Sequence, residues 1–373
     1  MNTVLDYLQS ESAAQANILN LDLDFSTATT EQISEFCTWL RTHPYLERIE
    51  FRSAHRPSTG VGADLSLLSS TVFRQIFTAI RDNPRIQTIM LPQCNLTHLI
   101  DVEALENLKD CLVTKKDITI IANRNTPLLN NGTLAKTVSL IAIGKAEKLK
   151  LREIISNKTS LTTVRTFLTN LTNATDKEFQ YVSLPHNHLK GDVLPEIANL
   201  ANLQITSLDL SENPLALGAS LEDWKVFFTT IQNNGALKSL SLKSCELWRS
   251  PISLEEEEAT EEQCLALFQN MLLKFVRETH LSALDLDLNE WDDEFLEKLH
   301  TAAQHNAHFY YFKCGHHAEP LISLANKAGS LGKFPSGPKI RRDSESTGRT
   351  SQEDTSIEDH HTASSLPGSK SRY

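Results

Sequence analysis

The sequence predicts a right-handed α/β solenoid, in which short parallel strands line a concave face and helices cover the convex face. Three observations predict it. A short pattern of apolar residues returns along the chain, and an amphipathic helical segment follows several of its copies. The last large apolar residue of a helix also lies six residues before the first residue of the next strand, as Leu40 lies before Leu46 and Ile80 before Ile86. Such a constant spacing is not expected of unrelated helices.

The clearest copy of the pattern runs from Ile205 to Leu215. Apolar residues occupy its first, fourth, sixth and last places, and Asn213 occupies the ninth. Because side chains alternate across a strand, the fourth and sixth residues should fill the core, and the third, fifth and seventh should face the other way. The other clean copies begin at Ile86, Phe179, Leu237 and Leu281, with Cys94, Asn187, Cys245 and Asn289 at the ninth place.

This pattern resembles the leucine-rich-repeat signature L-x-x-L-x-L-x-x-N/C-x-L. The units that contain helices resemble the ribonuclease-inhibitor-like class, which implies a horseshoe with strands on the concave face and helices on the convex face. The resemblance covers about residues 17 to 315, although the unit lengths vary more than in typical members. At the ninth place the chain leaves the strand, so we expect Asn there to bond backbone groups that have lost their ladder partners.

The first elements follow this pattern. Residues 1–16 carry apolar residues at helical spacing and should form an N-terminal cap. The first strand is expected to place Ile18, Leu21 and Leu23 at the first, fourth and sixth places. The next strand begins at Leu46. Helices are predicted over 30–43, 73–80, 224–231 and 292–305, because the apolar residues of each segment lie on one face. A Pro or Gly follows each of the first three helices.

The pattern decays between residues 94 and 187. Residues 118–122 and 138–143 are predicted as strands, and 149–173 mainly as helix. Two insertions, 55–65 and 250–262, follow strands and are interpreted as loops on the same edge of the solenoid.

The C-terminal part should contain a last strand over 309–312 and a capping helix over 319–327. The solenoid with this cap is therefore expected to span 17–328. Residues 329–373 have few large apolar side chains, which predicts a disordered tail.

Composition narrows the class of partner. The formal net charge of −11 argues against a nucleic-acid partner held through its phosphates. The first twenty residues predict neither a secretory signal nor a membrane span, and the six cysteines have no paired spacing, which predicts free thiols in a reducing compartment. We expect a cytoplasmic monomer that binds another protein.

Candidate chemistry is sparse. A group of histidines, among them His300, His305 and His308, lies near Cys314, but without a standard zinc spacing. Cys94 and Cys245 are explained by the repeat, and no nucleophile–base signature is present. We therefore predict no enzyme activity, no metal and no cofactor. The alternative is a repeat-bearing enzyme or ubiquitin-ligase component, as in leucine-rich-repeat ligases that carry a separate catalytic domain.

The strongest functional prediction concerns the side chains that face away from the core on the strands. Such a sheet is the surface with which this architecture ordinarily binds proteins. The residues predicted to bind the partner are Arg48, Glu50, Arg52, Tyr181, Ser183, Asp209, Ser241, Lys243, Asp285 and Asp287.

The tail suggests a location for this function. Its acidic pairs, Glu353-Asp354 and Glu358-Asp359, resemble translocation tails of effectors that intracellular bacteria inject into host cells. That resemblance implies a virulence effector, secreted into the host cytoplasm, that acts on a host protein. The alternative is a resident cytosolic scaffold or inhibitor.

Overall fold

The structure is a computed structural model of the chain. It describes residues 17–21, 28–51, 69–94, 102–122, 146–155, 159–173, 179–201, 203–249, 251 and 260–315. The chain divides into two units, Met1–Lys327 and Ala328–Tyr373, and the second lies wholly outside the described residues. All elements below belong to the first unit.

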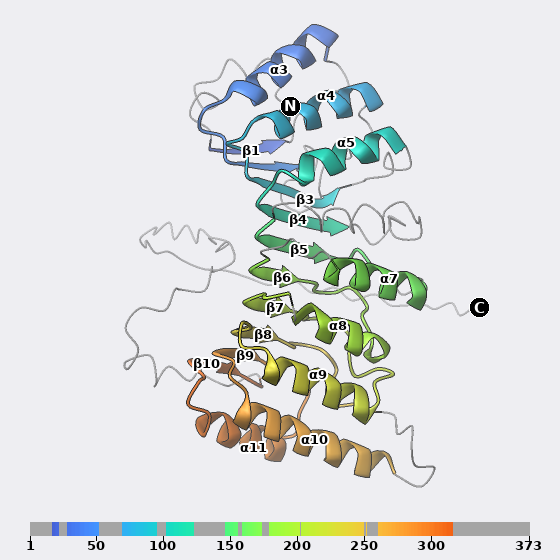
Figure 1. Ribbon diagram of the computed structural model, residues 1–373, viewed down its shortest axis with the longest axis vertical. Coiled ribbons are helices and arrows are strands. Elements are labelled where there is room, and N and C mark those ends of the chain that lie inside the picture. The colour runs from blue at the N-terminus through green and yellow to red at the C-terminus, as the bar shows by residue number, and fades with distance from the viewer. Residues whose placement is uncertain are drawn as a thin grey trace, which may run out of the picture. The chain divides into compact units, whose positions relative to one another are not determined.

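The first unit is built on one parallel sheet of ten strands, which are ordered as they follow one another in the chain (Figure 1). Each strand therefore pairs with the strand before it and the strand after it in sequence. Their bounds are β1 Ile18–Leu21, β2 Arg48–Phe51, β3 Thr88–Cys94, β4 Asp117–Ala122, β5 Lys148–Arg152, β6 Tyr181–Ser183, β7 Ser207–Asp209, β8 Ser239–Ser241, β9 Ala283–Asp285 and β10 Tyr311–Lys313.

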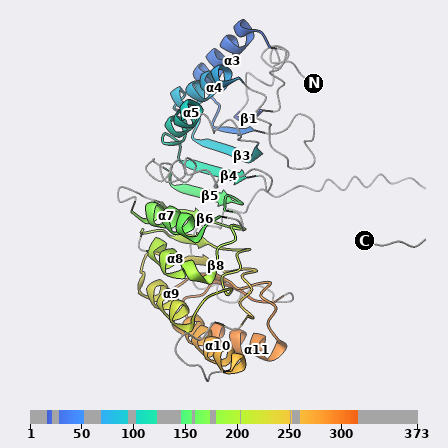
Figure 2. The same cartoon turned by 90° about the vertical axis from the view of Figure 1, so that its right-hand side faces the viewer.

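Helices connect the strands, and Figure 2 shows α3 to α10 on one side of the sheet. We call the opposite side the inner face. Six of the described α-helices begin at a Ser, Thr or Asp whose side chain accepts a backbone N–H of the first turn. The helices are α3 Thr30–Thr42, α4 Ser70–Asp82, α5 Val102–Leu112, α7 Leu161–Thr172, α8 Leu194–Ala201, α9 Leu221–Asn233, α10 Glu261–Glu278 and α11 Asp293–Gln304, with a 3-10 turn, η4, over Gly191–Val193.

The core lies between the sheet and the helices. Residues at the fourth place of each turn, such as Leu208 and Leu240, are buried. Aromatic rings of neighbouring helices also contact each other: the ring centroids of Trp224 and Phe268 lie 5.2 Å apart, and those of Phe228 and Phe275 lie 4.6 Å apart. Each turn thus buries its apolar side chains against the next turn, which confirms the predicted α/β solenoid.

A row of polar side chains links the C-terminal ends of successive helices. Asn83 Nδ2 donates to the carbonyls of Leu40 (2.7 Å) and His43 (3.1 Å), which are left without helical partners. Asn234 and Asn306 reach back to the preceding helix in the same way. After α5 there is no such Asn, and the buried Lys115 donates from Nζ to the backbone carbonyls of Ile80 and Ile86 instead.

The register predicted for the first strand is wrong. Ile18 pairs with Arg48 and Leu19 with Ile49, so Leu19 takes an inward place and Ile18 an outward one. Leu19 is buried, whereas Ile18 is 46% exposed. Leucine at 19, 21 and 23 lets the pattern slip by two residues without changing faces, and only pairing with β2 fixes it.

The helix predicted over 149–173 is also wrong at its start. Lys148–Arg152 is strand β5, with Leu149 and Leu151 fully buried, and helix α7 begins only at Leu161. The strand predicted over 118–122 is confirmed as β4, and the last strand begins at Tyr311 rather than at residue 309. The predictions for 1–16, 55–65, 138–143, 319–327 and 329–373 lie outside the described residues, as does most of 250–262.

Candidate protein-binding surface

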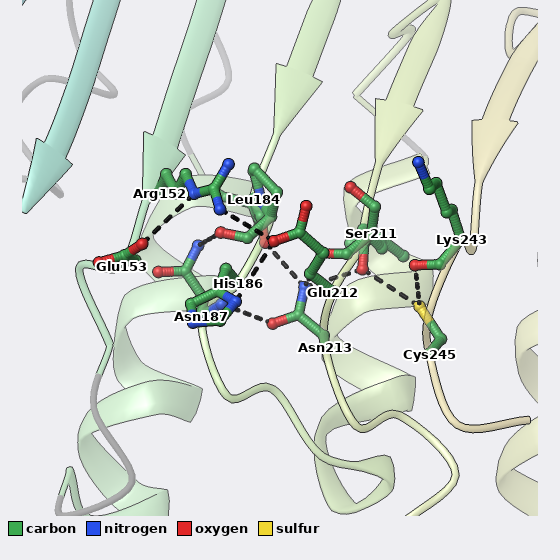
Figure 3. Close-up of polar contacts among 12 residues, drawn as sticks. Arg152, Glu153, Leu184, His186, Asn187, Ser211, Glu212, Asn213, Lys243 and Cys245 are labelled. Atoms are coloured by element: carbon green, nitrogen blue, oxygen red, sulfur yellow. Dashed lines mark hydrogen bonds and ion pairs between the residues drawn. The ribbon is translucent and has the colours of Figure 1, made fainter. Parts of the chain in front are cut away.

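Buried asparagines fix the path of the chain where it leaves β6, β7 and β9, and Figure 3 shows the first two, Asn187 and Asn213. Asn213 Nδ2 donates to the carbonyls of Leu184 and Leu210, both at 2.8 Å, and its Oδ1 accepts from the backbone N–H of Asn187 at 2.7 Å. Asn187 and Asn289 bond to their preceding turns in the same manner. At the equivalent place Cys245 Sγ donates to the Leu210 carbonyl at 3.3 Å. The ladder predicted for the ninth place is confirmed.

This ladder allows the chain to bend sharply after each strand. The residue at the eighth place takes a positive φ in five turns, although it is never glycine. Such backbone is strained for residues with a Cβ and persists only where the surroundings fix it. The residues are Glu153, His186, Glu212, Ser244 and Leu288.

Pairing of the strands places outward side chains in rows across the inner face. The fifth-place row runs through Lys150, Ser183, Asp209, Ser241 and Asp285, each beside the next. A second row passes through Lys148 and Tyr181. The face is therefore a continuous array of charged, hydroxyl and aromatic side chains.

Regular strand order, one-sided helices and the asparagine ladder together decide the fold. It is a leucine-rich-repeat solenoid. The prediction from the sequence pattern is thus confirmed on the geometry of the chain itself.

Comparisons with known proteins give little beyond this. Neither a protein-family model nor a curated protein matches the chain. Among solved structures, the chain is similar to LegL7, a leucine-rich repeat-containing protein from Legionella pneumophila, at 16% sequence identity and a TM-score of 0.48. The match covers 77% of this chain and 79% of that chain.

The predicted residues at the N-terminal end of the repeat sheet largely bind each other. Arg48 donates to Glu50 Oε2 at 3.1 Å, and Glu50 is buried. Their charges therefore compensate within the protein. Arg52 lies outside the described residues.

The predicted residues toward the C-terminal end form a carboxylate-rich region. Ser183 is fully buried and donates to Asp209 Oδ2 at 2.7 Å, while the N–H and hydroxyl of Ser211 donate to Asp209 Oδ1. Ser183 thus positions Asp209 and cannot itself contact a partner. Asp209, Ser241 and Lys243 are half-buried and reach the inner face.

Asp285 and Asp287 lie side by side on and just after β9. Asp285 Oδ1 accepts the backbone N–H of Asp287 at 3.0 Å, and Asp287 Oδ2 accepts from Lys313 Nζ at 2.5 Å. Burial raises the pKa of Asp285, since desolvation disfavours its charged form. Burial likewise raises the pKa of Tyr181 above its ordinary value.

The sequence prediction missed a basic strand. The outward side chains of β5 are Lys148, Lys150 and Arg152, and Lys148 is exposed. Alternation of Lys or Arg with buried Leu was the available signal, but the segment was interpreted as the start of a helix. Lys313 on β10 was missed as well.

Arg152 differs from its two neighbours because it is already paired. Its guanidinium contacts Glu212 Oε2 at 2.9 Å and Glu153 at 3.4 Å, and His186 Nδ1 lies 3.3 Å from the same Glu212 oxygen (Figure 3). This network joins three successive turns at the C-terminal ends of their strands. Arg152 is thus held in place, whereas Lys148 and Lys150 make no ion pair with any described residue.

One cysteine lies beside a histidine. Cys314 Sγ is 3.6 Å from His300 Nε2, but the thiol is 1% exposed and burial raises its pKa to about 12. A nucleophilic cysteine needs the opposite shift, because the thiolate is the reactive form. Cys314 occupies the sixth place of its turn, where an apolar side chain belongs, so packing accounts for it.

The described residues contain no group of three or more His, Cys, Asp or Glu side chains placed to hold a metal ion. No helix among them is both long enough and apolar enough to span a membrane.

Proposed function

We propose that the chain is a non-enzymatic interaction module that binds a partner protein on the inner face of its leucine-rich-repeat sheet. The observation that carries this proposal is the continuous array of outward side chains, which strand pairing holds in register from β2 to β10. Each strand from β2 to β9 pairs on both sides, so a partner cannot add a strand there. It must bind through side chains.

The composition of the face supports a folded protein as the partner. Tyr181 is a half-buried aromatic anchor with the cations of β5 on one side and the Asp209 carboxylate of β7 on the other. Aromatic anchors beside charges supply both affinity and orientation at interfaces between proteins. The backbone behind these side chains is fixed by the ladder, so little conformational entropy is lost on binding.

Crosslinking tests this proposal. A photo-reactive phenylalanine analogue replaces Tyr181 on the inner face or Val226, an exposed residue of α9, as the matched control. In cell lysate, the inner-face probe should crosslink to a discrete protein and the helix-face probe should not. Crosslinks from Val226 alone, or from neither position, would refute the inner face as the binding surface.

The more specific proposal, a translocated bacterial effector acting on a host protein, is supported only by the acidic pairs Glu353-Asp354 and Glu358-Asp359 in the C-terminal sequence. A reporter fusion tests it in bacteria that carry an injection system. Removal of 329–373 should abolish transfer into host cells and leave crosslinking at position 181 intact. Absence of transfer by the full chain would favour the resident scaffold or inhibitor.

A further inference from the structure

Opposite charges occupy different strands along one stretch of the fifth-place row, from β5 to β9. Outside that stretch the charges are mixed, because Asp117 pairs in register with Lys148 and Lys313 pairs in register with Asp285. On β5, Lys148 and Lys150 point out of the sheet, and neither side chain contacts a carboxylate among the described residues. On β7 and β9, Asp209 and Asp285 hold the equivalent fifth place to Lys150. Ser183 and Ser241 lie between them in the row, and their side chains are too short to bridge the opposite charges.

The two carboxylates are held in place by the protein. Asp209 accepts three hydrogen bonds from Ser183 and Ser211, and Asp285 accepts the N–H of Asp287. These bonds come from neutral donors, and neither carboxylate has an ion pair at hydrogen-bond distance with another described residue. Lys313 on β10 pairs in register with Asp285, but its Nζ contacts Asp287 Oδ2.

The geometry sets a spacing. Neighbouring strands lie about 4.8 Å apart, so Lys150 is about 10 Å from Asp209 and about 19 Å from Asp285 along the row. An α-helix rises about 1.5 Å per residue, and it would cover these distances in about 7 to 13 residues. The backbone groups of a helix bond within the helix, so a helix does not need to pair with the edge of a sheet.

Resting on the function proposed above, we propose that the inner face recognises a bipolar helical segment of its partner, with carboxylates over β5 and ammonium or guanidinium groups over β7 to β9. The acidic end contacts Lys148 and Lys150, with Tyr181 beside them. The basic end contacts Asp209 and Asp285, whose desolvation a cation would offset. A uniformly acidic ligand such as a nucleic acid would be repelled by these carboxylates.

The test uses two synthetic helical peptides of identical composition and the full-length protein. One carries two Glu in its first turn and two Arg about 13 residues later, which matches the span from Lys150 to Asp285. The other carries the same four charges interspersed. We expect saturable binding of the segregated peptide, and binding of the interspersed peptide weaker by about fivefold or more.

Variants of the protein locate the contact. Lys148→Glu with Lys150→Glu should weaken binding of the segregated peptide by about tenfold or more, because attraction becomes repulsion at two positions of the inner face. The matched control is Lys225→Glu with Lys298→Glu on the exposed surfaces of α9 and α11, which should change binding by less than about twofold. Circular dichroism confirms that each variant is folded.

Three results would overturn the inference: no saturable binding of the segregated peptide, equal binding of both peptides, or tighter binding of a polyglutamate peptide than of the bipolar one. None of them bears on crosslinking at position 181. If that crosslink forms while the peptides fail, the interaction module stands and its charge recognition is wrong. If the crosslink also fails, the proposed function falls with it.

Discussion

A single side-chain amide closes the turns that follow β6, β7 and β9. Asn213 is fully buried and bonds to the preceding turn and to its own, since it donates to Leu184 and Leu210 and accepts from Asn187 and Leu189. Its donors and acceptor replace the ladder partners that the backbone loses after the strand. At the same place the thiol of Cys245 faces the Leu210 and Lys243 carbonyls, 3.3 and 3.6 Å from Sγ, and acts as a weaker donor than an amide.

Asn213→Ala should therefore lower the free energy of unfolding by about 3 kcal/mol, because it leaves several buried backbone groups without partners. Urea denaturation measures this loss. The matched control is Asn199→Ala on the exposed surface of α8, where the same chemical change should be neutral or slightly stabilising. Equal effects at the two positions would show that the ladder contributes nothing particular.

Buried thiols give the protein a pH dependence. Burial raises the pKa of Cys111 and of Cys314 to about 12, whereas an unfolded thiol titrates near 9. The folded state thus retains protons that the unfolded state loses, so stability is complete below pH 9 and falls as pH rises toward the folded pKa. Lys115 acts in the opposite sense, because burial lowers its pKa.

A double variant, Cys111→Ala with Cys314→Ala, should lose stability less steeply than the native protein between pH 9 and 11. Each thiol contributes at most about 1.4 kcal/mol per pH unit to that slope. Urea midpoints of both proteins measured at pH 8 and pH 10 give the two slopes. The difference between the proteins at pH 8 measures the stability lost to the cavities that the two alanines leave. Parallel slopes in the two proteins would contradict the assigned pKa shifts.

At the scale of elements, the backbone of one turn lies against the next at η4. A Cβ on Gly191 would lie 2.2 Å from Ala219 Cβ and 2.3 Å from its backbone nitrogen. The same glycine N–H bonds to the Leu217 carbonyl at 2.9 Å, so the turn cannot move away without losing that bond. Glycine is required here by close approach.

Gly191→Ala should consequently destabilise the protein by more than about 3 kcal/mol, the range of severe overpacking. Its matched control is Gly235→Ala, where a Cβ meets no atom within 4 Å. That variant should be neutral or stabilising by up to about 1 kcal/mol, since it restricts the unfolded chain. Thermal melts of both variants provide the measurement, and a mild Gly191→Ala would mean that α8 and α9 can separate at this point.

Elements were predictable where the full pattern is present. The copies at Phe179, Ile205, Leu237 and Leu281 fix strand, face and turn together, because the ninth-place residue adds a signal that alternation alone lacks. Strand β5 has Ile154 at that place, and its N–H is bonded by Asn187 from the next turn. The Asn that bonds the end of β5 thus lies in the next repeat and leaves no mark in the sequence of β5 itself. Because β5 was not predicted as a strand, its cations were absent from the predicted binding surface.

The sequence could not give exposure on the inner face either. Tyr181, Asp209 and Lys243 reach the surface as predicted, but Ser183 is buried by its bond to the neighbouring strand. Glu50 is buried beside Arg48 for a similar reason. Accessibility depends on pairs across strands, which a template for one repeat does not contain.

At the scale of the whole unit, each described turn contacts its neighbours in a linear order from β1 to β10. Stability in such an array is close to a sum of local contributions and nearest-neighbour interfaces. A defect in one turn should therefore weaken adjacent turns and leave distant turns protected, in contrast to a globular domain that unfolds as one unit.

Leu208→Asp tests this property in the middle of the array. Leu208 lies at the fourth place of β7, 1% exposed, and a buried unpaired carboxylate there should cost several kcal/mol. Hydrogen exchange should show lost protection over about 179–249, with amides of α4 and of α11 remaining protected. Ser207→Asp adds the same charge one residue earlier, facing away from the core, and should cost less than about 0.5 kcal/mol. Uniform loss of protection from α4 to α11 in Leu208→Asp would contradict the nearest-neighbour description, because a single buried charge would then have unfolded turns that it does not touch.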